Sequence, residues 1–376
     1  MVTAASPHSH AAGEARACRG CPALSPRWRG LGQGQVWLRH YRFLKGFTVK
    51  AKPKTAVLCG GDSSEREVSM LSGMAVAEAL AMRGIDVVSI DVRGTDFLKM
   101  MRDSRVEVAF LALHGSFGED GQIQAILDAA AIPYTGSSAR ASKLGMDKAA
   151  AKQTLMEHGV PTPRYHVAGP ADGGVALRAA ADDLGWPVVV KPPCGGSSVG
   201  VSIARTPREF DAAVGRSREL EHDVMLEEYI PGRELTVAVF NGRALPVIEI
   251  ICSGFYDFKN KYTKGHTEYV VRPALPEAVE RAVLDAGVAT YTCLGCAGAA
   301  RVDVRLDPSN RPWVLEINTI PGMTATSLLP KAARAVGIEF PELCEMVVAD
   351  ALERFPARLS DAKKAGQPGV EKRASA

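Results

Sequence analysis

Between residues 54 and 113, short apolar runs alternate with one long amphipathic stretch. Residues 55–61 form an apolar run that ends in two glycines, which predicts a buried strand followed by a tight turn. Residues 64–83 repeat apolar side chains at three- and four-residue intervals, which predicts a helix. Apolar runs at 85–91 and 106–113 predict two more strands. The apolar stripe of the helix is expected to consist of Val68, Leu71, Ala75, Ala79 and Met82.

This order of strand, helix and strand predicts a parallel sheet with crossover helices. Ligands of such sheets bind beyond the carboxyl ends of the strands. Gly60-Gly61 and His114-Gly115 follow two of the predicted strands, so we expect them at the ligand-binding edge of the sheet.

A second unit is expected to begin near Met146. Residues 148–158 have helical spacing and are followed by a glycine and a proline. Residues 187–191 and 201–204 are predicted strands, and the glycine-rich loop between them is expected to be the tip of a hairpin. A further strand is predicted at 223–229.

A third unit is expected from Glu234 onward. Predicted strands at 235–240 and 244–251 flank Asn241-Gly242, which is a strong hairpin signal. The polar residues 253–272 carry no predicted element, and a loop of this length in a compact domain is usually functional. The remaining predicted elements are a helix at 276–294 and strands at 299–306 and 311–317, joined by an Asp-Pro-Ser-Asn turn.

These patterns predict a mixed α/β (α+β) fold of three domains, at 54–145, 146–231 and 232–360, of which the first is a parallel α/β domain. Residues 1–53 show no sustained periodicity and are rich in Ala, Gly, Arg, Pro and Ser. We interpret them either as a disordered leader or as an artefact of start assignment, in which translation begins near Val49, and we favour these two interpretations over a transit peptide. Residues 361–376 are interpreted as a polar tail.

Composition narrows the class of protein. The 376 residues are 46% hydrophobic and 23% charged, which is ordinary for a globular protein of more than one domain. No apolar run approaches the roughly 18 residues of a membrane span, so no membrane partner is expected. The net charge is +3, and residues 1–50 alone carry +7, so the remainder carries −4. A mildly acidic body does not indicate a nucleic-acid partner.

The eight cysteines include two Cys-x-x-Cys pairs, Cys18/Cys21 and Cys293/Cys296. A zinc site would need two such pairs close together or matching histidines, and these pairs lie far apart in the chain. Cys293 and Cys296 fall in an apolar stretch that is typical of a buried helix, where free cysteines behave as small hydrophobic residues. Nothing requires an oxidising compartment, so we expect a cytoplasmic protein.

The loop Gly195–Gly200 could hold an anion, because successive glycines leave backbone N–H groups free and its serines add hydroxyl donors. Lys191, just before the loop, would supply the positive charge that a phosphate needs. The loop matches neither the Walker motif nor the dinucleotide fingerprint. A plain flexible hairpin explains this loop equally well, so both interpretations stay open.

Arg301 and Asp303 lie two residues apart on one predicted strand, and Glu316 and Asn318 lie two apart on the next. Residues i and i+2 of a strand share a face, so the four polar groups would converge if the two strands pair. Oxygen ligands of this kind suit Mg²⁺ completed by phosphate oxygens and water. The alternative is a surface hairpin with a solvated charged face.

Three further polar segments are weak when taken alone. Residues 60–69 place Glu65 at a predicted helix start, where the helix dipole favours an acid in any case. His114 opens the glycine-rich loop 114–121, although a lone histidine is more often packed or hydrogen-bonded than catalytic. Lys261-Tyr262 lies in the long polar segment and has no meaning without context.

Taken together and in order, these segments resemble the D-alanine:D-alanine ligases of the ATP-grasp superfamily. The resemblance covers roughly residues 54–355, and the ordered set is specific to that family. The matching motifs are GGxSxEREVS at 60–69, HGxxGEDG at 114–121, PYTGS at 133–137, MDK at 146–148, GSSVG at 196–200, KY at 261–262, RVDV at 301–304 and ExNTxPGMT at 316–324.

The resemblance implies a three-domain ATP-grasp fold, ATP as co-substrate, two Mg²⁺ (or Mn²⁺) ions, two D-alanine molecules as substrates and a homodimer. It implies an acyl-phosphate intermediate in the synthesis of D-alanyl-D-alanine for peptidoglycan precursors. The residues implied at the nucleotide end are Lys148 and Lys191 for the phosphates, Glu227 and Glu234 for adenine or ribose, and Asp303, Glu316 and Asn318 for the metal ions.

The same resemblance implies the amino-acid end of the site. Glu65 would hold the ammonium of the first D-alanine with His114 nearby, and Arg301 with the amide of Gly322 would stabilise the oxyanion. The residues implied for the carboxylate of the second D-alanine are Lys261, Ser327 and the adjacent Leu328, while Ser197 and Tyr262 would join Glu65 in a hydrogen-bonded set that closes the site.

Two alternatives remain open at this point. A ligase that joins D-alanine to D-lactate would differ in the loop that carries Tyr262, so this residue argues against that activity. A catalytically silent ATP-binding homologue would lack a metal carboxylate or the oxyanion arginine, and this chain has Arg301, Asp303 and Glu316. One departure from the family pattern is Cys194, directly before Gly195, where relatives often carry other residues.

Overall fold

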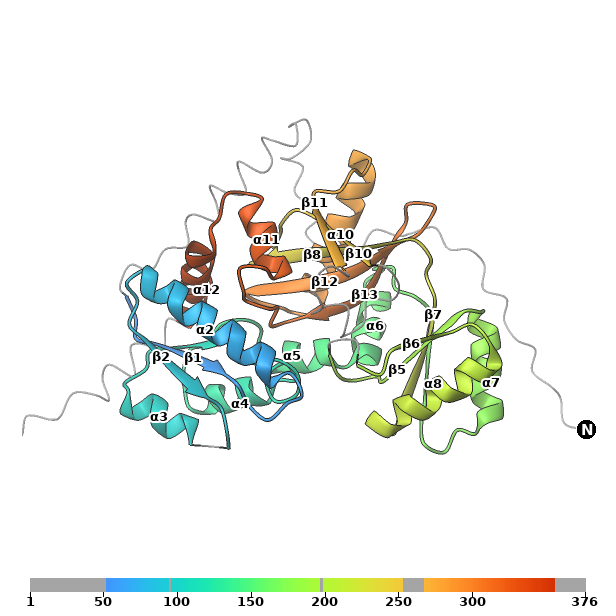
Figure 1. Cartoon of the computed structure of the whole chain (residues 1–376), viewed down its shortest axis with the longest axis horizontal. Coiled ribbons are helices and arrows are strands. Elements are labelled where there is room, and N and C mark those ends of the chain that lie inside the picture. The colour runs from blue at the N-terminus through green and yellow to red at the C-terminus, as the bar shows by residue number, and fades with distance from the viewer. Residues whose placement is uncertain (1–51, 95, 197–198, 253–266, 356–376) are drawn as a thin grey trace, which may run out of the picture.

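The structure is a computed structural model that describes residues 52–94, 96–196, 199–252 and 267–355. The leader, apart from Lys52 and Pro53, and the polar tail lie outside this described part. Three sheets, each with its own helices, surround the middle of the molecule (Figure 1). No helix in the described ranges has the length and apolarity that a membrane span requires.

The N-terminal sheet is parallel, as predicted. Its order is β2-β1-β3, and both neighbours run parallel to the central strand β1. Helices α2 and α3 pack on the sheet. The strands are β1 (Thr55–Cys59), β2 (Val87–Asp91) and β3 (Val108–Leu111), and the helices are α2 (Arg66–Met82), α3 (Phe97–Asp103) and the following α4 (Gln122–Ala129).

The predicted apolar stripe of α2 is wrong in part. Leu71 and Met82 are 62% and 73% exposed, whereas the residues that face the protein are mostly small. A Cβ atom on Gly73 would lie only 2.4 Å from the Cβ of Cys59, so α2 approaches β1 more closely than a larger side chain allows. Hydrophobic spacing misses such a face because its packing relies on small residues. The buried residues are Ser69, Ser72, Gly73, Val76, Ala79 and Leu80.

The second sheet is antiparallel, with the order β4-β7-β5-β6. Strands β5 and β6 pair as the predicted hairpin, with the glycine-rich loop at its tip. Helices α7 and α8 pack on the strands, and Phe210 of α8 lies in their shared core with Val188 and Leu226. The elements are β4 (Tyr165–Ala168), α7 (Gly174–Leu184), β5 (Val188–Lys191), β6 (Ser202–Ala204), α8 (Pro207–Leu220) and β7 (Val224–Glu228).

The third and largest sheet is also antiparallel, with the order β11-β10-β8-β12-β13 and β9 paired to β8. Helix α10 packs against β8, β12 and β13. The elements are β8 (Arg233–Phe240), β9 (Arg243–Ala244), β10 (Ile248–Cys252), β11 (Thr267–Val271), α10 (Glu277–Cys293), β12 (Ala299–Leu306) and β13 (Pro312–Asn318).

Two predictions for this sheet need correction. The single strand predicted at 244–251 is divided into β9 and β10, because the pairing shifts by one residue between Val239↔Ala244 and Thr236↔Ile248. Pro246 lies in the shifted stretch, and proline cannot donate a ladder hydrogen bond. The segment 253–272, predicted to hold no element, contains β11 at its end, while residues 253–266 lie outside the described part.

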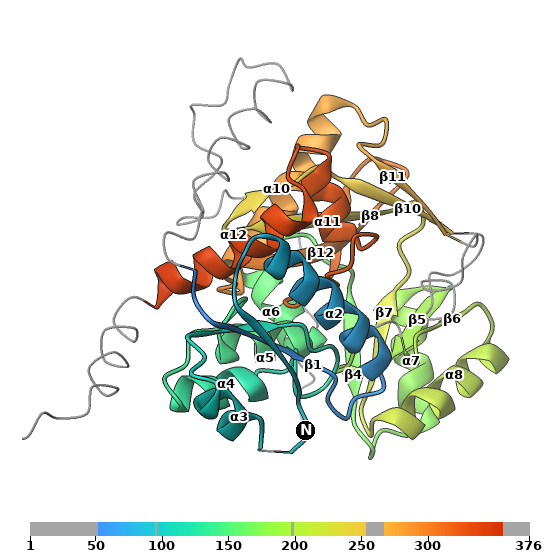
Figure 2. The same ribbon diagram turned by 60° about the vertical axis from the view of Figure 1, so that its left-hand side comes forward.

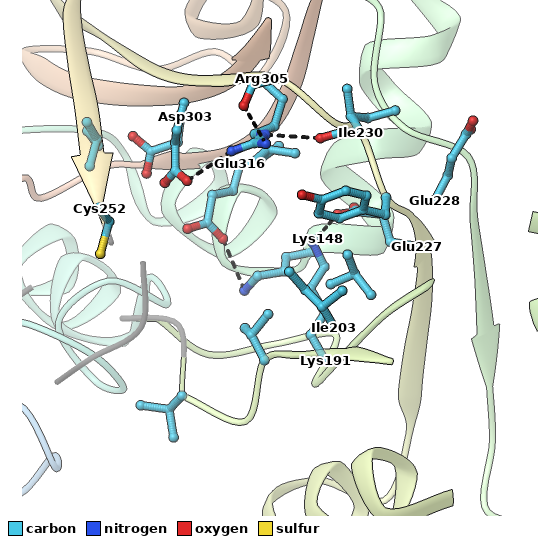
Figure 3. A pocket seen from close by; sticks show the side chains of 18 of the residues that line it. Lys148, Lys191, Ile203, Glu227, Glu228, Ile230, Cys252, Asp303, Arg305 and Glu316 are labelled. Carbon is cyan, nitrogen blue, oxygen red and sulfur yellow. Dashed lines mark hydrogen bonds and ion pairs between the residues drawn. The ribbon is translucent and has the colours of Figure 1, made fainter. Parts of the chain in front are cut away.

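Helices α5 (Ala139–Met146) and α6 (Lys148–Glu157) follow the N-terminal sheet and pack against β13. Asp147 separates them, and its carboxylate accepts a hydrogen bond from the backbone N–H of Ala150, which caps α6. This cap places Lys148 at the first position of the helix, where its side chain turns toward the middle of the molecule (Figure 3).

The C-terminal helices return to the N-terminal sheet. Helix α12 (Phe340–Arg354), which follows α11 (Leu328–Arg334), packs beside α2 (Figures 1 and 2). Arg83 Nη2 lies 2.5 Å from Glu345 Oε2 across this contact. One hydrophobic core therefore contains Leu80 from α2, Phe240 from the large sheet and Leu343 from α12. The predicted domain boundaries at 145/146 and 231/232 stay predictions.

The corrected face of α2 can be tested with one substitution on each side of the helix. Leu80→Ala should lower the free energy of unfolding by about 2–5 kcal/mol, because Leu80 is fully buried in the shared core. Met82→Ala should change it by less than about 0.5 kcal/mol, because that side chain is exposed. Urea denaturation followed by circular dichroism measures both, and equal effects would contradict the assigned face.

Candidate active site

Two cavities lie side by side between the sheets and meet at Lys148, Gly195, Gly196 and Glu316. The first has a volume of about 540 Å³ and the second about 480 Å³. Every site residue predicted from the sequence and described by the structure lines at least one of them. Lining the first are Lys148, Lys191, Glu227, Glu234, Asp303 and Glu316. Lining the second are Glu65, His114, Lys148, Arg301, Glu316, Asn318, Gly322, Ser327 and Leu328.

Strands β12 and β13 pair as the sequence required for their polar groups to converge. Asp303 lies opposite Glu316, and Arg301 lies opposite Asn318. The pairing shifts by one residue after Asp303, which leaves Leu315 as the extra residue on β13. On the opposite face of β12, Val302 and Val304 are fully buried. The alternative of a solvated surface hairpin is therefore wrong.

The carboxylate of Asp303 is held from two sides. Arg301 donates to it through Nε (2.9 Å to Oδ1) and Nη2 (2.8 Å to Oδ2), a bidentate pair. The hydroxyl of Thr236 on the neighbouring β8 lies 2.9 Å from Asp303 Oδ1. Asp303 lines the first cavity and Arg301 lines the second, so this ion pair connects the two.

Lys148 lies at the junction of the cavities. Its Nζ donates to the backbone carbonyl of Gly195 and lies 3.6 Å from Glu316 Oε2. Figure 3 shows Lys148 directed at Glu316 across the cavity. The side chain is only 7% exposed, so its charge is compensated mainly by these protein groups. The glycine-rich loop, the start of α6 and the end of β13 therefore meet at one cation.

Lys191 ends β5 and belongs to a buried set of three charges. Its Nζ donates to Glu227 Oε1 at 2.8 Å, and Lys152 Nζ lies 2.7 Å from Glu227 Oε2. All three side chains are at most 7% exposed. Burial works against ionisation of Glu227, but the two ammonium groups outweigh it and lower the pKa of the carboxyl. Burial lowers the pKa of Lys152 to about 8 despite its carboxylate partner.

Apolar side chains form part of the wall of the first cavity. Val189, Ile203 and Leu315 line it, and Tyr229 and Ile230 follow the end of β7. Arg305 fixes this segment, because its Nε donates to the carbonyl of Ile230 at 3.1 Å (Figure 3). A flat apolar group with a few polar edges fits such a wall, and a charged group fits the lysine end.

Glu65 lies between two loops of glycine-rich sequence. It precedes α2 and is 7% exposed. A Cβ atom on Gly115 would lie 3.0 Å from Glu65 Oε2, and one on Gly196 would lie 3.3 Å away. Gly115 also has a positive φ of 74°, which larger residues rarely adopt. Glycine at these positions therefore allows the loops after β3 and β5 to approach the carboxylate.

His114 lies three residues after the end of β3, lines the second cavity and has two partners. Its Nε2 lies 3.1 Å from the hydroxyl of Ser72 on α2, and its Nδ1 lies 4.0 Å from Glu119 Oε1. The other oxygen of Glu119 accepts a hydrogen bond from the backbone N–H of Gly115. The imidazole is thus oriented by α2 and by its own loop.

The opposite wall of the second cavity comes from the segment that follows β13. A Cβ atom on Gly322 would lie 3.0 Å from the hydroxyl oxygen of Ser327, so the two are close neighbours. The hydroxyl of Ser327 also lies 2.8 Å from that of Thr324. Lys331 of α11 lines the same wall, with Nζ 4.3 Å from the centre of the Tyr269 ring. The wall thus offers hydroxyl and ammonium donors.

Three predicted residues cannot be placed, because Ser197, Lys261 and Tyr262 lie outside the described residues. Other residues were missed by the sequence analysis. Lys152 follows Lys148 by one helical turn, and Glu119 lies within the loop that His114 opens. Their positions in the sequence do not identify the side chains that they contact. The ion pair from Lys152 to Glu227 joins positions far apart in sequence, and only the fold brings them together.

The oxygen donors at the end of the β12–β13 hairpin could hold part of a metal shell. Two carboxylates and one amide are available, and the amide oxygen of Asn318 already accepts a hydrogen bond from the N–H of Ile320. Among the described residues, no group of three His, Cys, Asp or Glu side chains could enclose a metal ion alone. A hard cation that takes its remaining ligands from phosphate and water fits this donor set.

The arrangement of two antiparallel sheets around the first cavity matches solved structures of ATP-grasp ligases. The structure of D-alanine--D-alanine ligase from Bacillus anthracis complexed with ATP has a TM-score of 0.72 and 34% identity, and the match covers 81% of this chain and 99% of that one. The VanG D-Ala:D-Ser ligase from Enterococcus faecalis has a TM-score of 0.69 and 29% identity, over 80% of this chain and 100% of that one. The fold is therefore that of the ATP-grasp ligases.

Sequence comparisons define the family within that class. The family models "D-ala D-ala ligase N-terminus" and "D-ala D-ala ligase C-terminus" match residues 95–137 and 155–349. The D-alanine--D-alanine ligase of Syntrophotalea carbinolica is 46% identical over 301 residues, which cover 79% of this chain and 96% of that protein. That of Anaeromyxobacter sp. (strain K) is 46% identical over 296 residues, covering 78% and 96%. The chain belongs to the D-alanine–D-alanine ligase family.

The contribution of the hydrogen bond between Thr236 and Asp303 to the free energy of unfolding can be measured. Thr236→Val should lower the free energy of unfolding by about 1.5–3 kcal/mol, because it removes a buried hydrogen bond to a carboxylate. Thr290→Val is the matched control, since the Thr290 hydroxyl is equally buried but donates to the neutral carbonyl of Ala286. That control should cost about 0.5–1.5 kcal/mol by urea denaturation. A smaller effect at Thr236 than at Thr290 would contradict the charged acceptor.

Proposed function

We propose that this chain joins two D-alanine molecules to D-alanyl-D-alanine at the expense of ATP, for the synthesis of peptidoglycan precursors. The observation that carries the proposal is the junction of the two cavities at Lys148 and Glu316. One cavity would take the nucleotide and the other the two amino acids, so phosphoryl transfer would occur where they meet. Membership of the D-alanine–D-alanine ligase family supports the same reaction.

The first step overcomes the poor reactivity of a carboxylate. The carboxylate oxygen of the first D-alanine attacks the terminal phosphorus of ATP, the bond to the bridging oxygen of ADP breaks, and an acyl phosphate forms. Lys148 and Lys191 would bind the phosphates, because both ammonium groups line the first cavity. Glu227 and Glu234 would contact adenine or ribose, because both side chains line the same cavity.

Asp303, Glu316 and Asn318 would hold two Mg²⁺ or Mn²⁺ ions, whose chemistry when bound is to neutralise charge on the transferred phosphoryl group. The register of β12 and β13 supports this role, because it places the two carboxylates opposite each other. The bidentate Arg301–Asp303 pair would keep the Asp303 carboxylate oriented at the first cavity.

The second cavity would orient the amino acids. Glu65 is a buried carboxylate that could bind the ammonium group of the first D-alanine, with His114 beside it. Ser327 and Leu328 line the opposite wall, where the carboxylate of the second D-alanine would bind. The proposed contributions of Lys261, Ser197 and Tyr262 rest on the family pattern alone, because these residues lie outside the described part.

In the second step, the free amine of the second D-alanine attacks the acyl phosphate carbon. Negative charge develops on the carbonyl oxygen, phosphate leaves, and the amine loses a proton. Arg301 and the backbone N–H of Gly322 would stabilise that oxyanion, since both residues line the second cavity. Water would hydrolyse the acyl phosphate, so the reaction needs a closed site. The proposed lid is the part of the segment 253–272 that precedes β11.

The function is tested by phosphate release from ATP and Mg²⁺ in the presence of D-alanine, with the product identified by mass. L-alanine, D-lactate and D-serine serve as alternative substrates, and D-serine is included because the similar VanG protein is named a D-Ala:D-Ser ligase. Phosphate release that depends on D-alanine, with D-alanyl-D-alanine as product, supports the proposal. ATP binding without turnover would indicate a silent homologue. The homodimeric state and cytoplasmic location stay predictions.

Arg301→Ala should reduce turnover by about a hundredfold or more, because one oxyanion donor is lost. The fold should persist, as judged by circular dichroism. Arg311→Ala is the matched control, since Arg311 belongs to the same hairpin, packs over the Trp313 ring and lines neither cavity. That variant should retain turnover, and near-normal turnover of Arg301→Ala would refute the assigned role.

A further inference from the structure

Lys152 is a buried cation that lines neither cavity. Its side chain is 1% exposed, yet its Nζ lies 2.7 Å from Glu227 Oε2. Lys191, the other partner of Glu227, does line the first cavity. One carboxylate is thus shared by a lysine that a ligand can reach and a lysine that it cannot.

The position of Lys152 is fixed by groups from several elements. Its Nζ donates to the hydroxyl of Thr162 at 2.6 Å, and that hydroxyl donates to the carbonyl of Val314 on β13 at 2.8 Å. The Tyr165 ring centre is 5.8 Å away. Lys152 is therefore held beside Glu227 by groups that do not line the first cavity.

The three charges sum to +1 in an interior that would receive a polyphosphate. A phosphate that attracts the ammonium of Lys191 weakens the one cation that faces the cavity and compensates Glu227 among the described residues. A buried carboxylate without a cation would take up a proton instead of remaining charged. A second cation on the protected side prevents this.

We propose that Lys152 is a positioning residue that keeps the Glu227 carboxylate ionised and in place when a nucleotide engages Lys191. The inference rests on the nucleotide-binding role proposed above for the first cavity. Lys152 itself would touch no substrate. With Lys152 in place, Glu227 would accept a hydrogen bond from the nucleotide while Lys191 binds the phosphates.

The groups around Glu227 agree with this assignment. Lys152 faces it from α6 and Lys191 from β5, and Tyr165 lies opposite it on β4. Burial raises the pKa of the Tyr165 hydroxyl, which stays neutral. The pKa of Lys152, at about 8, leaves it mostly charged at neutral pH, when the carboxylate needs a partner.

The experiment measures proton uptake during nucleotide binding. The full chain and its Lys152→Gln and Lys152→Met variants are titrated with AMP-PNP and Mg²⁺ by calorimetry, in phosphate and in Tris buffer at pH 7. The dependence of the heat on buffer gives the number of protons bound. Each variant should take up roughly one more proton per nucleotide than the unaltered chain, because Glu227 becomes protonated.

Affinity provides a second readout. At pH 7 the variants should bind AMP-PNP about tenfold more weakly or worse, since Glu227 must take up a proton on binding, and each unit by which the pH exceeds the pKa of Glu227 in the free variant is a tenfold effect. Because the bound state then holds the extra proton, their affinity should improve as the pH falls from 8 to 6. Lys152→Arg should behave as the unaltered chain, and adding Glu227→Gln to Lys152→Gln should abolish the extra proton.

Lys54→Met is the matched control, since Lys54 forms an exposed ion pair with Asp86 away from both cavities. Circular dichroism establishes which variants are folded, and Lys152→Gln keeps a donor for Thr162 if the Met variant does not fold. An unchanged proton count, or an affinity loss that does not vary with pH, would overturn the inference alone. Failure of the unaltered chain to bind the nucleotide would overturn the proposed function as well.

Discussion

The antiparallel pairing of β12 with β13 is the contact on which both cavities depend. Its register sets Asp303 against Glu316 and Arg301 against Asn318, and it turns Val302 and Val304 into the core under α10. A slip of one residue would exchange these faces and bury the charges, so the apolar side of the hairpin fixes the place of the polar side. The chemistry of the site is thus specified by hydrophobic packing on the other face of the same strands.

The buried charged groups of the site each have more than one polar partner. Glu227 pairs with two lysines, while Lys148 contacts the carbonyl of Gly195 in the loop after β5 and the carboxylate of Glu316 on β13. Isolated charges in so dry an interior would change their protonation, whereas shared ones remain ionised and keep cations available to an incoming anion. Because Gly195 follows β5 of the small sheet and Glu316 lies on β13 of the large sheet, Lys148 also links these two parts of the molecule.

The sequence predicts the strands, the parallel sheet and the convergence of Arg301, Asp303, Glu316 and Asn318, because alternation is a local property. It fails where packing depends on small residues or on distant partners. The buried face of α2 uses Ser69 and Gly73, which hydrophobic spacing cannot detect, and the partnership of Lys152 with Glu227 spans 75 positions. Motif resemblance locates the cavity-lining residues. It gives no sign of Lys152, which lines neither cavity and contacts Glu227 from the protein interior.

The return of α12 to α2 has a mechanical consequence. The N-terminal sheet and the large sheet share one core through these helices, so turning one against the other would expose apolar surface. The small sheet β4-β7-β5-β6 has a separate core of its own with α7 and α8. Rotation of this sheet as a rigid body would therefore disrupt the least packing, and the connection after β7, where Arg305 binds the carbonyl of Ile230, would have to bend. The N-terminal and large sheets would then stay together as one rigid body. The small sheet would move relative to them and would carry Lys191 and the glycine-rich loop with it.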